Sequence, residues 1–170
     1  MYDLRTKELR NFNMRQTNEE KGRLHNNWVM SMMIDSRGNL WVGTSSNLCC
    51  YDPDNDTFRP DGWEVLLEGK SVTALYERPR VGASAGMDER HRIVVGTDTG
   101  LFLYDSQKGD FVAFPGAEPL ADKVVCGIMQ DSFGDLWCST SMGIWQYQSS
   151  QRRFIAHEAK IGRASCRERV

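Results

Sequence analysis

The sequence predicts an all-β protein, and more specifically part of a β-propeller. Three stretches, Val29–Asp52, Val72–Asp105 and Val125–Gln148, follow one residue pattern, and self-similarity with a period of 20–50 residues marks an array of repeated units. Four short strand signals are expected in each unit, and four-stranded units in tandem are typical of propeller blades. No window shows the 3.6-residue apolar spacing of an amphipathic helix. We therefore expect essentially no helix.

Matched residues set the period of the repeat. A small residue and a tyrosine recur in each unit, separated by 53 and then 43 residues. The ten extra residues belong to the second unit, where an insertion at 79–90 replaces a short turn. At a hairpin tip such an insertion is readily tolerated, so a partner contact is the less favoured interpretation. The expected structural anchors are Asp35, Gly38, Trp41, Gly43, Tyr51, Gly96, Tyr104, Gly134, Trp137 and Tyr147.

The first unit illustrates the expected elements in order. A β-permissive strand, Val29–Ile34, ends at the turn 35–39, where Asp and Gly suit a tight hairpin. The second strand, Leu40–Thr44, alternates apolar residues between its two faces. A turn at 45–47 leads to a third strand ending at 51–52, and after the turn 53–56 the fourth strand begins at Thr57–Arg59.

Two tryptophans occupy equivalent positions on the second strand of their units. Trp41 and Trp137 correspond, while the second unit has Val94 there. Valine would be a poor replacement for a ligand-stacking indole but a reasonable one for a packing side chain. We therefore predict that these tryptophans fill the space between neighbouring blades.

The repeat gives the domain organisation. Residues 1–157 are expected to form an incomplete propeller, because closure usually needs about four to eight blades. Residues 1–20 would be the end of a preceding blade, and the three blades would span 24–62, 69–115 and 122–157. The last ten residues, 161–170, break the pattern, and we interpret them as a non-native, sequencing-adapter-derived tail.

Charge and composition disfavour several classes of partner. The formal net charge is −2, or −4 without the tail, and no basic run is interleaved with aromatics, so nucleic-acid binding has little support. The longest apolar runs have strand length, far below the roughly 18–20 residues of a membrane-spanning helix. No signal-peptide pattern precedes the repeats.

The cysteines and histidines do not form a metal motif. Outside the tail there are four cysteines, and none of the histidines has ligand spacing to them, so no metal and no cofactor is expected. We interpret the cysteines as small buried hydrophobic residues, with a disulfide between blades as the alternative. They are Cys49, Cys50, Cys126 and Cys138.

The units resemble the two-component regulator propeller repeat. In the first unit the matching residues are Val29, Asp35, Gly38, Leu40, Trp41, Gly43, Thr44, Leu48, Tyr51 and Asp52. In the third they are Val125, Asp131, Gly134, Leu136, Trp137, Thr140, Ile144 and Tyr147. The third unit departs at Ser139 and Gln148, and the second lacks both the Asp-x-x-Gly turn and the tryptophan.

This resemblance implies a periplasmic sensor region of a Bacteroidetes-type hybrid two-component regulator. Members of that family usually sense carbohydrate breakdown products, so an oligosaccharide ligand is implied. The full-length parent would be a membrane-anchored histidine kinase, acting as a homodimer, with a phosphorelay that controls transcription. This chain would itself carry out no catalysis.

Ligand contacts are expected on one rim of the propeller. The turns between second and third strands and the connections between blades should share that rim, where polar and aromatic side chains suit sugar hydroxyl groups. The candidate ligand-binding residues are Asn26, Asn27, Asn47, Trp63, Lys70, Asp98 and Lys123.

Two other classes of function stay open. A propeller lyase would need catalytic side chains converging at the central rim, and the three histidines do not recur in register. A passive interaction scaffold would belong to a parent that has no membrane segment.

Overall fold

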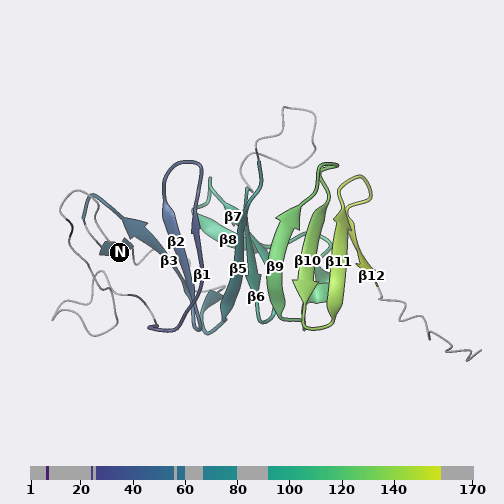
Figure 1. Ribbon diagram of the computed structural model, residues 1–170, viewed down its shortest axis with the longest axis horizontal. Helices are drawn as coiled ribbons and strands as arrows, with labels where there is room; N and C mark the ends of the chain where they lie inside the picture. Colours follow the sequence, from purple (N-terminus) through teal and green to yellow (C-terminus); the bar gives the residue numbers. More distant parts are fainter. Residues whose placement is uncertain are drawn as a thin grey trace, which may run out of the picture.

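The structure, a computed structural model, describes residues 7, 24, 26–55, 57–59, 67–79 and 92–157. They form three four-stranded antiparallel sheets, shown side by side in Figure 1. Residues 1–6, Trp63, most of the insertion and the tail at 161–170 lie outside the described residues, so the preceding blade predicted at 1–20 is not tested.

Each sheet is a meander that we call a blade. Blade one contains β1 (Val29–Ile34), β2 (Leu40–Thr44), β3 (Leu48–Asp52) and β4 (Thr57–Arg59). Blade two contains β5 (Val72–Glu77), β6 (Ile93–Thr97), β7 (Gly100–Asp105) and β8 (Asp110–Ala113). Blade three contains β9 (Val125–Gln130), β10 (Leu136–Thr140), β11 (Gly143–Gln148) and β12 (Arg153–His157). A short 3₁₀ helix, η1 (Glu118–Leu120), which the sequence pattern did not predict, connects blades two and three.

The first strands of the blades lie next to one another. In each sheet the strands follow chain order, so β1, β5 and β9 are edge strands. β1 packs against β5, and β5 packs against β9. The sheets therefore fan out from a common side, as blades do around a propeller axis. The fold is a partial β-propeller, as the sequence predicts.

An aspartate organises the first hairpin of blade one. The Asp35 carboxylate accepts backbone N–H bonds from Arg37 and Asn39, both at 2.9 Å. It also accepts the indole N–H of Trp41 at 2.9 Å. Gly38 has φ +88°, a conformation that suits glycine. The Asp-x-x-Gly-x-Leu-Trp sequence is therefore one hydrogen-bonded unit.

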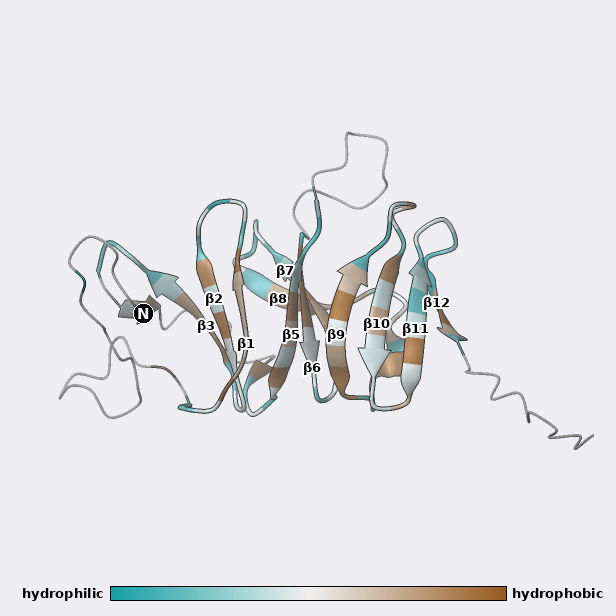
Figure 2. Cartoon of the chain, viewed as in Figure 1, coloured by the Kyte–Doolittle hydropathy of each residue, from teal (hydrophilic) through white to brown (hydrophobic). Residues whose placement is uncertain are grey.

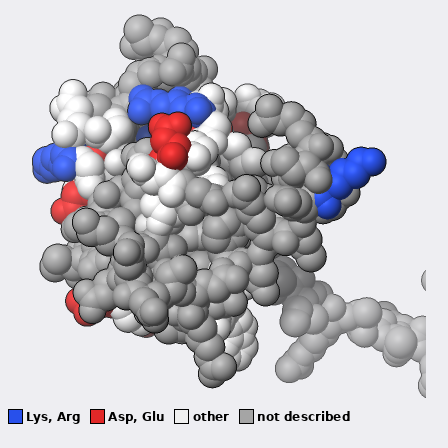
Figure 3. Space-filling view, turned by 90° about the vertical axis from the view of Figure 1, so that its left-hand side faces the viewer, with Lys and Arg blue, Asp and Glu red and all other residues white. Residues whose placement is uncertain are grey.

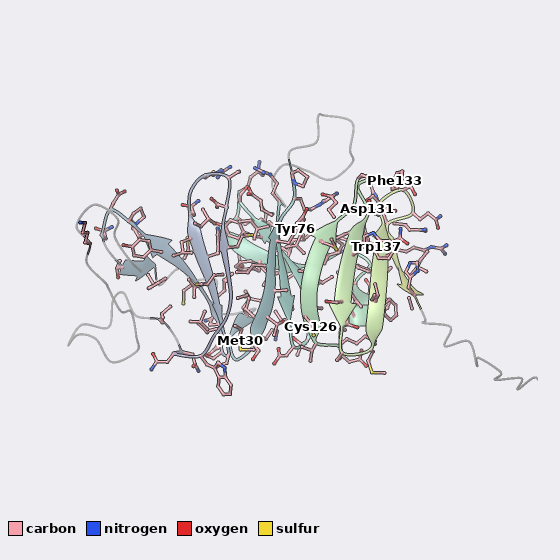
Figure 4. The ribbon with its side chains drawn as sticks, viewed as in Figure 1. Met30, Tyr76, Cys126, Asp131, Phe133 and Trp137 are labelled. Atoms are coloured by element: carbon pink, nitrogen blue, oxygen red, sulfur yellow. The ribbon has the colours of Figure 1, made fainter. Side chains whose placement is uncertain are left out.

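Blade three repeats this unit. The Asp131 carboxylate accepts backbone N–H bonds from Phe133 at 2.9 Å and Asp135 at 3.0 Å, and the indole N–H of Trp137 at 2.7 Å. Gly134 has φ +87°. Figure 4 shows Asp131 and Trp137 on the same sheet, with Phe133 at the tip of the turn.

The core lies between blades. Trp41 is 3% exposed and packs between blades one and two, with its ring 5.2 Å from that of Tyr104. A second cluster joins blades two and three and includes Val94, Leu136 and Tyr147. Figure 2 shows apolar residues along the strands and polar residues in the turns. Trp41 and Val94 thus fill the space between blades as expected, whereas half-buried Trp137 faces away from blade two.

The four cysteines that the structure describes form no disulfide with one another. Cys49, Cys50 and Cys138 are buried, in line with their interpretation as small hydrophobic residues. Cys126 is exposed, so that interpretation was wrong for this residue. It lies on β9, an edge strand of its sheet. Burial raises the pKa of Cys138 to about 12, so its thiol stays protonated at neutral pH.

Candidate functional site: a rim shared by the three blades

Two sets of loops form one edge of the molecule, the lower edge in Figure 1. We call this edge the connection rim; it comprises residues 26–28, 45–47, 69–71, 98–99, 122–124 and 141–142. Backbone hydrogen bonds join the two sets, from the Ser45 N–H to the Trp28 carbonyl and from the Asp98 N–H to the Ser71 carbonyl. In blade three, the Ser141 N–H makes the equivalent bond to the Val124 carbonyl. The loops predicted to share a rim therefore do so.

Bonds between blades also hold this rim. The Ser71 hydroxyl donates to the Ser45 carbonyl at 2.9 Å, and the Gly69 N–H donates to the Ser46 carbonyl at 3.0 Å. Blade one therefore positions the connection that leads into blade two. The rim is a preformed surface rather than a set of independent loops.

The asparagines predicted to contact a ligand have different environments. Asn26 is half-buried, and its Oδ1 accepts the Trp28 N–H at 2.8 Å. Asn27 is exposed on the rim. Asn47 is buried, at 4% exposure, and its Oδ1 accepts the Leu48 N–H at 2.8 Å. Asn47 therefore stabilises its turn and offers little surface to a ligand, while Asn27 stays accessible.

The charged candidates lie along the same rim. Lys70 is half-buried in the connection between blades one and two. The Lys123 ammonium pairs with Asp122 at 2.7 Å and lies 5.6 Å from the ring centroid of Trp145, a cation–π geometry. Hydrogen bonding from Lys123 lowers the pKa of Asp122, which keeps that carboxylate ionised.

Two buried polar atoms near this rim lack partners among the described residues. One is Oδ1 of Asp98, in the turn between β6 and β7, and the other is Nε1 of Trp145 on β11. Buried polar groups are normally hydrogen-bonded, and exceptions often coincide with a site for water or a ligand. Asp98 was predicted as a candidate, whereas Trp145 was not.

Trp28 is the main rim residue that the sequence prediction missed. Its side chain is 72% exposed, beside Asn26 and Asn27, and the rim also exposes Met142, at 72%. Met30 lies near the same edge in Figure 4 and is 45% exposed. The Asn-Asn-Trp sequence could have signalled this aromatic, because the corresponding residues before β5 and β9 are Ser71 and Val124.

The opposite edge, which we call the hairpin rim, has a different character. It carries the turns 35–39 and 131–135 and the stem of the insertion, where the Arg78 N–H donates to the Arg92 carbonyl at 2.8 Å. Glu77 accepts hydrogen bonds from Ser36 and pairs with Arg92 at 2.9 Å. This network ties the blade-one hairpin to blade two.

On the side drawn in Figure 3, the described charged side chains are scattered: some basic and acidic groups lie together, and others lie apart. Within the described ranges, no group of three or more His, Cys, Asp or Glu side chains could hold a metal ion. No helix in this part of the chain is long and apolar enough to cross a membrane.

Comparisons with known proteins agree with the repeat pattern. Residues 23–46 match the family described as "Two component regulator propeller". No curated protein matches the chain.

Solved structures share the fold. The extracellular domain of Bacteroides thetaiotaomicron BT4673, designated a hybrid two component system, aligns with TM-score 0.68 and 23% identity over 93% of this chain and 19% of that one. Another structure of the BT4673 domain, designated a one component system, gives the same TM-score and identity over 92% of this chain. The corresponding BT3049 domain aligns with TM-score 0.65 and 18% identity, over 91% of this chain and 20% of that one.

The chain therefore spans about a fifth of the solved domains that it matches. Its first unit matches the family in sequence, and its three blades match those domains in fold. Residues 23–46 thus match the two-component regulator propeller repeat, and the three blades share the fold of the extracellular domains of BT4673 and BT3049.

Proposed function

We propose that this chain is part of the extracytoplasmic, ligand-sensing propeller of a hybrid two-component regulator. In this proposal the parent protein is a homodimeric histidine kinase in the inner membrane, and these blades lie in the periplasm. The blades bind a ligand and catalyse no reaction. The family match and the fold of the BT4673 and BT3049 domains support this assignment.

The proposed ligand is an oligosaccharide bound on the connection rim. The observation that carries this proposal is the exposed indole of Trp28 next to Asn27, on a rim held by hydrogen bonds between blades. Ligand sites combine apolar or aromatic surface with a few placed polar groups. An indole face can stack on the C–H face of a sugar ring, while an asparagine amide can both donate to and accept from its hydroxyl groups.

Ligand binding would act on the kinase by favouring one arrangement of the sensor. A ligand shifts such an equilibrium only as far as its affinities for the two arrangements differ. The rim contains connections from several blades, so a bound ligand contacting more than one of them would be sensitive to their relative positions.

The test is oligosaccharide binding to matched aromatic variants. Trp28→Ala is expected to weaken the affinity for a bound oligosaccharide, identified from a glycan array, by at least about tenfold, or ~1.4 kcal/mol. Phe133→Ala is the control, because Phe133 is 91% exposed but lies on the hairpin rim. Equal affinities for Trp28→Ala and the unsubstituted chain would refute the rim site, and binding only of non-carbohydrate ligands would refute the ligand class.

A further inference from the structure

The connection rim carries a lysine at the same place in two successive connections between blades. Lys70 and Lys123 each lie two residues before the first strand of their blade. The backbone N–H of each lysine donates at 3.0 Å to the carbonyl of a leucine three residues earlier, Leu67 or Leu120. Both leucines are fully buried. The two connections therefore hold their lysines in equivalent turns that are anchored in the core.

The two lysines differ in their charge partners. The Lys123 ammonium pairs with Asp122 at 2.7 Å, whereas the residue before Lys70 is Gly69. Among the described residues, no carboxylate lies within ion-pair distance of Lys70. The rim's other carboxylate belongs to Asp98, and its Oδ1 atom is buried. Lys70 is therefore the rim lysine whose charge no neighbouring carboxylate neutralises.

Hydrogen bonds place Lys70 and the exposed Trp28 around one turn, at 45–46. The first residue of this turn donates its backbone N–H to the Trp28 carbonyl at 3.0 Å. The two carbonyls of the turn accept the Ser71 hydroxyl at 2.9 Å and the Gly69 N–H at 3.0 Å. Gly69 and Ser71 are the chain neighbours of Lys70, so the segments that carry Trp28 and Lys70 are fixed to the same two residues.

The environment of Lys70 suits an anion from solution. Lys70 is half-buried, and lysines in such positions pack the alkyl stem against the protein while the ammonium group stays in water. Opposite charges attract more strongly near a protein surface than in bulk water, because the effective dielectric constant is lower. A ligand could place an anionic group at Lys70 and a sugar ring on Trp28, which is 72% exposed.

We propose that the ligand of the connection rim is an acidic oligosaccharide, and that Lys70 binds the carboxylate or sulfate of a sugar unit near the one that stacks on Trp28. This inference rests on the proposed function and names the class of its ligand. The formal net charge of the chain is −2, so the whole molecule does not attract anions over long distances. The selectivity is therefore local and depends on one ammonium group.

The test is a glycan array of matched pairs, read with the full chain. Each uronic-acid oligosaccharide is printed beside its carboxyl-reduced form, and each sulfated one beside its desulfated form. We expect the acidic member of the bound pair to bind about 5- to 13-fold more tightly. This range lies between the largest effect of an exposed ion pair and the smallest effect of a hydrogen bond to a charged group.

Three variants assign the selectivity to Lys70. Lys70→Gln should reduce the affinity for the acidic member by the same 5- to 13-fold and leave that for the neutral member unchanged, while Lys70→Arg keeps the charge and should keep the preference. Lys108→Gln is the control: it makes the same charge change at an exposed lysine in the turn between β7 and β8, at the end of β7 away from this rim. The tail arginines are common to all variants.

The salt dependence gives a second measurement on the same variants. Raising NaCl from about 0.1 M to about 1 M shortens the Debye length from about 10 Å to about 3 Å. The preference of the unsubstituted chain for the acidic member should fall over this range. The affinity of Lys70→Gln should change little, because its contact with the ligand no longer includes the ammonium group.

The outcomes separate this inference from the function on which it rests. Equal affinities for acidic and neutral members, both weakened by Trp28→Ala, would leave the rim site standing and overturn the acidic class. An acidic preference that survives Lys70→Gln, or that Lys108→Gln removes equally, would overturn the role of Lys70. The absence of binding to every member would overturn the proposed oligosaccharide site and this inference with it.

Discussion

Replacing Trp41 with alanine is expected to lower the free energy of unfolding by about 3–5 kcal/mol. Trp41 is 3% exposed, and a buried tryptophan removes roughly 150–250 Å² from water, an upper bound of ~4–6 kcal/mol at about 25 cal/mol per Å². The change also removes the indole donor to the Asp35 carboxylate, 2.9 Å away, and the contact with the Tyr104 ring.

Trp137 provides the matched comparison, because it makes the same hydrogen bond to its own turn aspartate, at 2.7 Å. It is half-buried and faces away from blade two, so Trp137→Ala should cost only about 1–2 kcal/mol. Trp41→Phe separates the two contributions, since it keeps most of the packing and loses only the N–H donor.

The assay is urea unfolding followed by circular dichroism, with the midpoint and the slope fitted separately. A change of midpoint at constant slope reports stability alone. Equal losses for Trp41→Ala and Trp137→Ala would refute the reasoning, because they would show that packing between blades adds nothing to the turn hydrogen bond. A loss below about 1 kcal/mol for Trp41→Ala would do the same.

Two further predictions concern the packing and the turns. Gly43→Ala should destabilise the chain by about 1–3 kcal/mol in the same unfolding assay, since its Cβ would lie 2.6 Å from the Val72 carbonyl oxygen. Gly38→Ala is the comparison: a Cβ at Gly38 would meet open space, so this variant tests the strain of a positive φ without a steric clash. For Asp35, burial raises the pKa, but hydrogen bonds from Trp41, Asn39 and the backbone outweigh it and the net pKa is lowered. Its stabilising contribution is therefore present above the unfolded-state pKa of about 4 and is lost as pH falls through the folded-state value. Asp35→Asn should be less stable at pH 7 and lose less stability than the unsubstituted chain on acidification; parallel pH profiles for the two would contradict this.

Strand positions could be predicted from the sequence because they depend on local signals. Val29–Ile34 and Leu40–Thr44 are strands with the expected bounds, separated by the Asp-Gly turn. The alternation of apolar residues along a strand and the residue types of a turn depend on only a few neighbouring residues. The repeat shows the same strand and turn pattern in more than one unit. η1 has only three residues, too few to show an apolar spacing, although its last residue, Leu120, corresponds to Leu67, which is also helical in the preceding connection.

The environments of individual rim residues could not be predicted in the same way. Asparagine is a common residue type in exposed turns, but the Asn47 side chain accepts the backbone N–H of the next residue and is buried. Cys126 is of a residue type that is usually buried, but it lies on edge strand β9 and is exposed. The exposure of Trp28 likewise depends on how one blade's connection lies against a turn of the same blade. These are tertiary properties, and a residue's type alone does not determine them.

The stem formed by Arg78 and Arg92 makes blade two a natural acceptor for foreign sequence. The main-chain bond between them and the Arg92–Glu77 ion pair close the hairpin before the intervening segment begins. The stem is thus closed by residues on either side of the insertion, and each doubling of the joining length costs only about 0.6 kcal/mol in closure entropy. A reporter peptide or an epitope grafted between them would project from the hairpin rim, on the opposite side from the connection rim.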